Sequence, residues 1–202
     1  RVLNVAGRPT ILVKRFDQAP APEAETRRFY LSAHTLLGLD ESGLDRRKWS
    51  YLELAHLVRR ISDEPEADVI ELFRRMVFNA LVTNLDDHPR NHAVIGTATG
   101  GWRLSPAFDL VASSAASADS RELAMICGAL PGRERWGSRA NLVSGCRHFG
   151  LTSDEAASII DEIKAVVTAS WQAEVRAQGG TDQDCKNIAY AIAYEGFELC
   201  LL

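Results

Sequence analysis

The feature that most constrains the fold of this chain is one long amphipathic run that ends abruptly in a polar loop. Within residues 66–84 the apolar side chains recur at helical spacing. They are Val69, Leu72, Phe73, Met76, Val77, Ala80 and Leu81. Because this spacing places them on one face, the run predicts a buried helix. The sequence NLDDHPRN follows at residues 84–91, and its proline and turn-forming residues predict that the helix stops there.

Helical periodicity is also present on both sides of this run. The further helices that we expect cover residues 26–38, 50–62, 119–130, 138–150, 153–178 and 182–202. Two of them carry start signals, because Ser50 precedes Glu53 and Thr152 precedes Glu155 with the spacing of a capping box. Gly38 is placed to end the first of these helices.

Two β-hairpins complete the expected secondary structure. In the first, residues 2–5 (VLNV) and 10–16 (TILVKRF) flank the turn-forming sequence AGRP. In the second, residues 92–96 (HAVIG) and 101–105 (GWRLS) flank TATG. The predicted fold class is therefore mostly α with small β-hairpins (α+β).

Composition and charge argue against several classes of protein. The net charge of −4 gives no basic surface for nucleic acid or an anionic membrane. No apolar run is long enough to cross a membrane, and the first residues lack the apolar stretch of a signal peptide. The cysteines, which form no C-x-x-C pair, are Cys127, Cys146, Cys185 and Cys200. They predict buried thiols in a reducing, cytoplasmic setting.

The loop at residues 84–91 and Asp109 together carry the groups that phosphoryl transfer requires. Asp86 and Asn91 are separated by four residues, and Asp109 follows the second hairpin. One carboxylate can accept a hydroxyl proton, while an amide oxygen and a second carboxylate hold magnesium. The D-x-x-x-x-N spacing is that of the protein-kinase catalytic loop, and Pro89 would stiffen it.

Two other interpretations of the same loop remain open at this point. Asp86 or Asp87 can simply cap backbone amides in a polar turn. Alternatively, Asp86, His88 and His92 can form a zinc or redox-metal site of a metal-dependent hydrolase. Pro89 lies between the two histidines and the sequence after it has an extended pattern, so a shared helical face for these ligands is disfavoured.

Several motifs, in order between about Ile11 and Ala112, resemble the C-terminal lobe of the HipA-like serine/threonine kinases. They are ILVKRFD, RRFYLSAHTLLG, SYLELAHLVRR, MVFNALVTNLDDHPRNHAVI and WRLSPAFDLVAS. The resemblance implies a protein kinase that uses ATP and Mg²⁺ and acts as the toxin of a bacterial toxin–antitoxin pair. It further implies a protein substrate, with aminoacyl-tRNA synthetases as the known target class, and a helix-turn-helix antitoxin as partner.

The same resemblance implies roles for individual residues. Asp86 would be the catalytic base, and Asn91 and Asp109 would coordinate magnesium. The remaining positions implied for ATP binding are Lys14, Arg15 and Phe16 at the hinge, His88, Pro89 and Arg90 with Asn91 beside the phosphates, and Phe108 with Asp109 against the nucleotide. The resemblance gives no role to Asp87.

The resemblance also divides the chain into two parts. Residues 1–17 would be a hairpin and hinge strand at the junction of two kinase lobes, and 18–202 the helical C-lobe, with its catalytic and metal loops within 84–112. The glycine-rich phosphate loop and the ATP-contacting lysine of the family are absent, since VAGRPT has one glycine and Lys14 belongs to the hinge. A sequence starting at Arg1 is therefore expected to lack most of the N-lobe. A non-catalytic C-lobe interaction module is the alternative to an enzyme.

Overall fold

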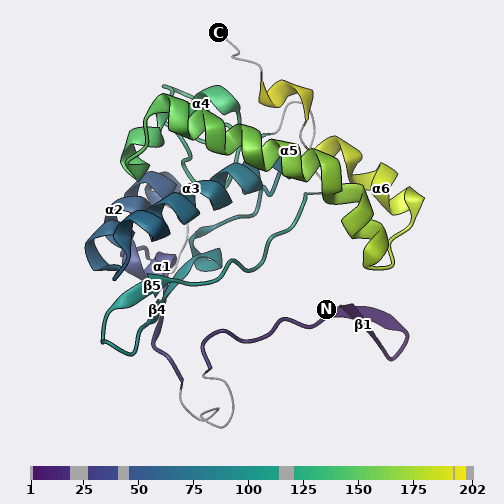
Figure 1. Cartoon of the computed structure of the whole chain (residues 1–202), viewed down its shortest axis with the longest axis horizontal. Helices are drawn as coiled ribbons and strands as arrows, with labels where there is room; N and C mark the ends of the chain where they lie inside the picture. Colours follow the sequence, from purple (N-terminus) through teal and green to yellow (C-terminus); the bar gives the residue numbers. More distant parts are fainter. Residues whose placement is uncertain (1, 19–26, 41–45, 114–120, 193, 199–202) are drawn as a thin grey trace.

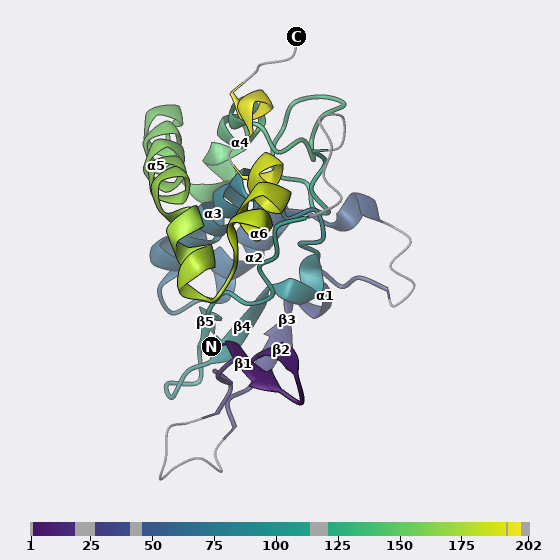
Figure 2. The ribbon, with the colours of Figure 1, turned by 90° about the vertical axis from the view of Figure 1, so that its right-hand side faces the viewer.

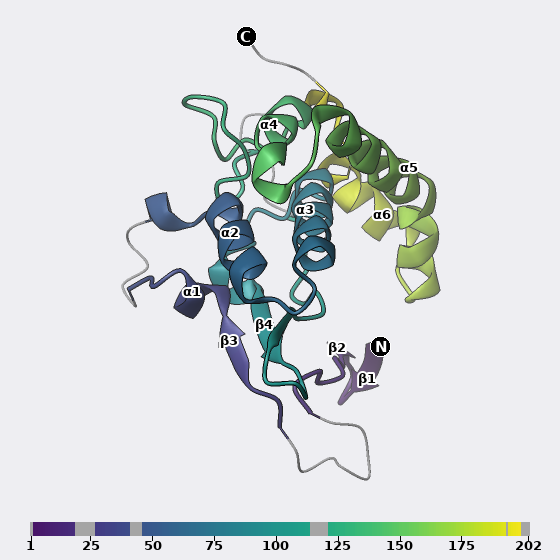
Figure 3. The same ribbon diagram turned by 60° about the vertical axis from the view of Figure 1, so that its left-hand side comes forward.

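Helix α3, Pro65–Leu81, is the element around which the rest of the structure is arranged (Figure 1). It packs between α2, Tyr51–Ile61, and α5, Ser153–Ala177, as Figure 3 shows. Every apolar side chain predicted for its buried face is buried. Proline stands at its first turn, where its missing N–H costs nothing. The predicted central helix is therefore confirmed, with an end three residues earlier than expected.

The structure is a computed structural model that describes residues 2–18, 27–40, 46–113, 121–192 and 194–198. The remaining helices are α1 (Ala33–Leu36), α4 (Arg139–Ser144) and α6 (Asp182–Ile188). Short 3-10 turns cover Arg46–Lys48, Pro89–Asn91, Cys146–Phe149, Ala189–Ala191 and Glu195–Phe197. The strands are β1 (Val2–Val5), β2 (Arg8–Ile11), β3 (Tyr30–Ser32), β4 (Ala93–Gly96) and β5 (Trp102–Leu104).

A small antiparallel sheet with the order β3-β4-β5 lies beneath the helices (Figure 2). The β4–β5 hairpin agrees with the prediction, and Val94 pairs with both Leu31 and Leu104. The helix predicted over 26–38 is wrong, because Tyr30–Ser32 within it form β3 and only Ala33–Leu36 is helical. Ser32 caps the first turn of α1 through its side chain, so the helix begins there.

The N-terminal hairpin is shorter than the sequence suggests. Its turn consists of Ala6 and Gly7, both with positive φ, so that Arg8 already pairs with Val5. Strand β2 ends at Ile11, opposite Val2. The predicted strand over residues 10–16 is therefore wrong in its second half. Lys14, Arg15 and Phe16 do not belong to a strand.

The segment from Arg121 to Leu130 is extended and irregular, so the helix predicted over 119–130 is wrong in its described part. Leu123, Ala124, Met125 and Cys127 are all buried, so the segment contributes to the core without helical structure. The segment is held from both sides by backbone hydrogen bonds, since Leu123 donates to the Arg135 carbonyl and Ile126 to the Trp49 carbonyl (both 2.8 Å).

The C-terminal helices agree with the sequence in their starts more than in their ends. The capping box before α5 is confirmed, because Thr152 and Glu155 exchange side-chain to backbone hydrogen bonds. The helix predicted over 182–202 ends at Ile188 and continues as separate 3-10 turns. Phe197 is nevertheless fully buried, so this apolar end packs onto the body.

The described cysteines are core residues. Cys127, Cys146 and Cys185 are buried free thiols, while Cys200 lies outside the described residues. Burial raises the pKa of the Cys127 thiol to about 12, which keeps it protonated and unreactive near neutral pH. Among the helices of the described ranges, none has the length and apolar character needed to cross a membrane.

Asp68 is a buried carboxylate that joins three elements. It stands in the first turn of α3 and accepts hydrogen bonds from the Leu104 N–H (2.8 Å) on β5 and the Ser62 hydroxyl (2.6 Å) after α2. The Arg103 guanidinium also donates to it (2.9 Å). Burial opposes ionisation, but these donors outweigh it, so that the pKa of Asp68 lies below its ordinary value of 3.8.

We expect Asp68→Asn to lower the free energy of unfolding by about 2 kcal/mol at neutral pH, because the donors around Asp68 lose a charged acceptor. A lowered folded-state pKa means that the stabilisation is present above pH 3.8 and is lost as the pH falls below it. Urea unfolding of both proteins at several pH values measures the difference. A gap between wild type and variant that widens towards low pH would contradict this account.

Candidate functional site

Two loops that carry acidic residues lie side by side because hydrogen bonds join them at both ends. At one end the Ser105 N–H donates to the Ala93 carbonyl (2.9 Å), which continues the β4–β5 pairing. At the other end the Ser113 N–H donates to the Thr83 carbonyl (3.1 Å). The first loop, residues 84–92, contains Asp86 and Asn91, and the second loop, residues 106–112, contains Asp109. The structure therefore brings the two predicted site segments into one place.

The first loop presents one of its adjacent aspartates to solvent and buries the other. Asp86 is exposed, whereas Asp87 is 1% exposed. The loop closes on itself through Asn91, whose Nδ2 donates to the Asp86 carbonyl (3.4 Å). This bond uses the donor side of the amide and leaves Oδ1 of Asn91 without a partner among the described residues. The arrangement therefore offers a free carboxylate and an amide oxygen on the same loop.

The second loop contributes an exposed carboxylate in a left-handed backbone conformation. Asp109 has a φ of +57° and is exposed. Exposed carboxylates together with the amide oxygen of Asn91 are the hard oxygen ligands that magnesium takes, usually with the remainder from phosphate and water. The donor set of the two loops thus fits a magnesium–phosphate group.

A buried hydrogen-bond network lies beneath the first loop. Oδ2 of Asp87 accepts from the Tyr51 hydroxyl and from Nε2 of His92 (2.8 Å). The Tyr51 hydroxyl accepts in turn from Nδ2 of Asn79 (3.0 Å), and Oδ1 of Asn79 accepts from Nδ2 of Asn84 (3.1 Å). All of these side chains are buried. We refer to them as the Asp87 network, and it attaches both ends of the first loop to α2 and α3.

The sequence did not reveal this network, although one signal was present. Asn79 is a fully buried amide in the last turn of α3, where its neighbours are apolar. A polar residue at such a position requires hydrogen-bond partners. No sequence motif linked Tyr51 to Asp87, because the two residues are 36 positions apart and meet only in the fold.

The entry to the first loop is held by the C-terminal segment. Thr83 has a φ of +52°, which is costly for a β-branched residue. Its hydroxyl donates to the Ala191 carbonyl and accepts from Nη1 of Arg121, both at 2.7 Å. The Arg121 guanidinium is buried over the Tyr194 ring, 3.9 Å from its centroid, and burial lowers the pKa of Arg121. Neither Thr83 nor Arg121 was suggested by any sequence motif.

The histidines of the loop face inward, which removes the ligands of the hydrolase interpretation. Nε2 of His92 is bonded to Asp87, and the His88 ring stands edge-on to Trp49 with centroids 6.3 Å apart. Pro89 is buried and Arg90 is exposed. Within the described ranges, no cluster of three or more His, Cys, Asp or Glu side chains is placed to hold a metal ion.

The predicted hinge residues differ in their surroundings. The Phe16 ring lies 5.6 Å from the Phe108 ring and 6.3 Å from Tyr30, measured between centroids. Lys14 and Arg15 are exposed, and the Arg15 guanidinium is bonded to Asp17. The structure therefore brings Phe16 and Phe108 together at the second loop and leaves the two basic side chains in solvent.

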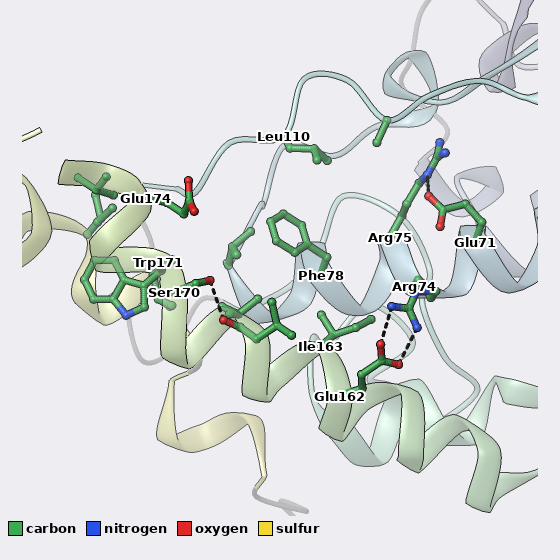
Figure 4. Close-up of a pocket in the computed structure, with 17 residues that line it drawn as sticks. Glu71, Arg74, Arg75, Phe78, Leu110, Glu162, Ile163, Ser170, Trp171 and Glu174 are labelled. Carbon is green, nitrogen blue, oxygen red and sulfur yellow. Dashed lines mark hydrogen bonds and ion pairs between the residues drawn. The ribbon is translucent and has the colours of Figure 1, made fainter. Parts of the chain in front are cut away.

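The second loop also forms one wall of an apolar groove (Figure 4). The groove has a volume of about 530 Å³ and lies between α3 and α5, with Phe78, Ile163 and Trp171 among its lining residues. Ala107 and Leu110 line it, but Phe108 and Asp109 between them do not. The loop thus has one side towards the groove, and its acidic residue is not part of the groove.

In this α+β fold, a D-x-x-x-x-N loop follows a buried helix and lies beside a second loop that carries an acid. This is the arrangement of a kinase-like C-terminal lobe. The family model described as "HipA-like C-terminal domain" matches residues 1–171. This chain belongs to the family of HipA-like C-terminal domains. The resemblance seen in the sequence motifs is confirmed.

Known relatives agree with this assignment. The chain is 26% identical over 125 residues to "Putative kinase Y4mE" of Sinorhizobium fredii (strain NBRC 101917 / NGR234), an alignment that covers 60% of this chain and 30% of that protein. The fold of the present chain matches that of a chain from the Shewanella oneidensis MR-1 toxin–antitoxin complex of HipA, HipB and operator DNA. The TM-score is 0.75 at 20% identity, over 95% of this chain and 48% of that chain. The chain thus spans about half the length of these relatives, or less. The structural likeness confirms the HipA-type fold.

The strain at Thr83 can be separated from its hydrogen bonds by two substitutions. We expect Thr83→Ala to lower the free energy of unfolding by about 2 kcal/mol, because buried Arg121 loses an acceptor while the positive φ remains. Thr83→Gly loses the same bonds but relieves the backbone, so it should be about 1 kcal/mol more stable than the alanine variant. Urea unfolding measures both. If the glycine variant were the less stable of the two, the strain argument would be wrong.

Proposed function

We propose that this chain is the C-terminal lobe of an ATP- and Mg²⁺-dependent protein kinase that phosphorylates serine or threonine. The observation that carries the proposal is the joining of the two loops at both ends, by the Ala93–Ser105 and Thr83–Ser113 hydrogen bonds. It holds Asp86 and Asn91 beside the loop of Asp109. Membership of the HipA-like family and the likeness to a protein named as a kinase support the same activity.

The exposed carboxylate of Asp86 is suited to act as the catalytic base. It would accept the proton of the substrate hydroxyl as the hydroxyl oxygen bonds to the γ-phosphorus and the bond to the leaving ADP breaks. Asn91, through Oδ1, and Asp109 would hold magnesium, which neutralises the charge on the transferred group. The Asn91 to Asp86 hydrogen bond keeps the base and the ligand in a fixed relation.

The aromatic contact between Phe16 and Phe108 would supply an apolar surface for the adenine. Phe108 directly precedes Asp109, so the adenine ring and the phosphates of one nucleotide would meet neighbouring residues of the second loop. Main-chain groups near Lys14 and Arg15 would provide the hydrogen bonds to the adenine edge. Arg90, exposed on the first loop, would lie on the phosphate side with His88 and Pro89.

The 202 residues contain no glycine-rich phosphate loop, so efficient transfer would require one from elsewhere in the complete protein or from a partner. The same absence favours a second candidate function, a non-catalytic lobe that binds another protein. Incubating the complete protein with MgATP and a protein substrate distinguishes the two, because only the kinase incorporates phosphate.

The partners that we propose follow from the family. The structural neighbour was solved with HipB and operator DNA, which suggests an antitoxin of the HipB kind for this chain. The net charge of −4 favours contact with DNA through that antitoxin and not directly. A protein such as an aminoacyl-tRNA synthetase would be the substrate, and the whole would work as a toxin–antitoxin pair in the cytoplasm.

We expect Asp86→Asn to reduce phosphoryl transfer by the complete protein at least about 10²-fold, because the proton acceptor is lost. Its melting temperature should stay within a degree or so of wild type, since the side chain is exposed. Transfer of labelled phosphate from ATP to protein measures the effect.

Asp154→Asn is the matched control, an exposed aspartate in the first turn of α5 that lies outside both loops. It should leave the transfer rate unchanged. Full activity of Asp86→Asn would remove Asp86 from the proposed role of base.

A further inference from the structure

We propose that Asp87 is a positioning residue, a buried carboxylate that fixes the first loop so that Asp86 and Asn91 face the reacting groups. The inference rests on the proposed kinase activity and concerns how its site is held. Tyr51 and His92 are the donors through which Asp87 acts. The D-x-x-x-x-N spacing selects Asp86 and gives Asp87 no role, so the role of Asp87 is inferred from its contacts and burial.

The burial of Asp87 excludes it from touching substrate. Its side chain is 1% exposed, and Oδ2 is already shared by the Tyr51 hydroxyl and His92 Nε2. A proton acceptor must come within hydrogen-bond reach of the substrate hydroxyl, which only the exposed Asp86 can do. The geometry therefore separates the two adjacent acids into a base and a support.

The bonding of Asp87 also argues against a role in stability alone. Its Oδ1 is buried and has no hydrogen-bond partner in the described structure. A buried carboxylate with an unpaired oxygen is destabilising, and a neutral side chain of similar shape would cost less. An acid at position 87 is thus better explained by its hydrogen bonds to Tyr51 and His92, which hold the first loop in place, than by a contribution to stability.

Asp87 can control Asp86 because the two are adjacent, with Cα atoms about 3.8 Å apart. The same oxygen that binds Tyr51, the first residue of α2, also binds His92, which ends the loop. Asn91 lies between Asp87 and His92, so one carboxylate oxygen closes the part of the loop that carries the magnesium ligand. A displacement of about 1 Å at reacting groups costs about 10²-fold in rate.

Four substitutions in the complete protein test the inference. Asp87→Ala removes the acceptor, and kcat should fall about 10²-fold. Tyr51→Phe removes one of the two donors, and a fall of about 10-fold is expected. His92→Gln places an amide N–H near the position of Nε2 and should retain most activity, whereas His92→Ala should not. In each case KM for ATP should rise by a smaller factor than kcat falls, because Asn91 moves with the loop while the contacts to the adenine remain.

Asp68→Asn is the matched control for loss of stability. Asp68 is likewise a buried carboxylate that accepts several hydrogen bonds, but it joins α3 to β5 and lies outside the two loops. This variant should melt at a lower temperature and, below that temperature, keep the kcat of wild type. The comparison separates a weakened fold from a displaced base. If Asp87→Ala fails to fold, Tyr51→Phe and the two His92 variants still decide the question.

The outcomes separate this inference from the proposed function. If wild type and Asp87→Ala share the same kcat while Asp86→Asn is inactive, the inference is overturned and the kinase stands. If the wild-type protein transfers no phosphate, the kinase fails, and amide hydrogen exchange of residues 84–92 decides the positioning role. Faster exchange in Tyr51→Phe than in Asp68→Asn would support it, and equal rates would overturn it.

Discussion

The constraint on which the site depends is the pair of backbone hydrogen bonds that joins the two loops at their ends. Loops that carry carboxylates repel each other and lose conformational entropy when they are ordered. The Ala93–Ser105 bond extends a hairpin that is already paired, and the Thr83–Ser113 bond returns the second loop to the end of α3. Folding therefore brings the two acid-bearing loops together through backbone hydrogen bonds alone.

The core along α3 combines apolar packing with buried polar networks. Val69, Phe73 and Val77 are buried, whereas Asp68 in the first turn bonds to β5 and Asn79 in the last turn begins the Asp87 network beneath the site. Apolar packing tolerates small shifts of side chains, but hydrogen bonds in a buried network fix direction as well as distance. The polar end of the core can thus orient a loop in a way that the apolar part cannot.

Sequence patterns predicted the parts of this fold that local spacing determines. The helix over 66–84 and the hairpin over 92–105 have clear periods, and the spacing of Asp86, Asn91 and Asp109 marked the loops that the structure joins. Strand β3 and the extended segment after Arg121 were missed, because their partners are distant in sequence. The role proposed for Asp87 was hidden for the same reason, since Tyr51 lies 36 residues away.

The two loops are held to different degrees, and this difference bears on their chemistry. The first loop buries Asp87, Pro89 and Asn91, while the second loop exposes Asp109 and Leu110 beside an open groove. A base acts on a proton whose position the substrate sets, so it must be in place beforehand. A ligand to magnesium can adjust as the ion binds, because its coordination includes exchangeable water and phosphate oxygens. In the proposed kinase, rigid support would therefore be needed most under Asp86, which is where the buried network lies.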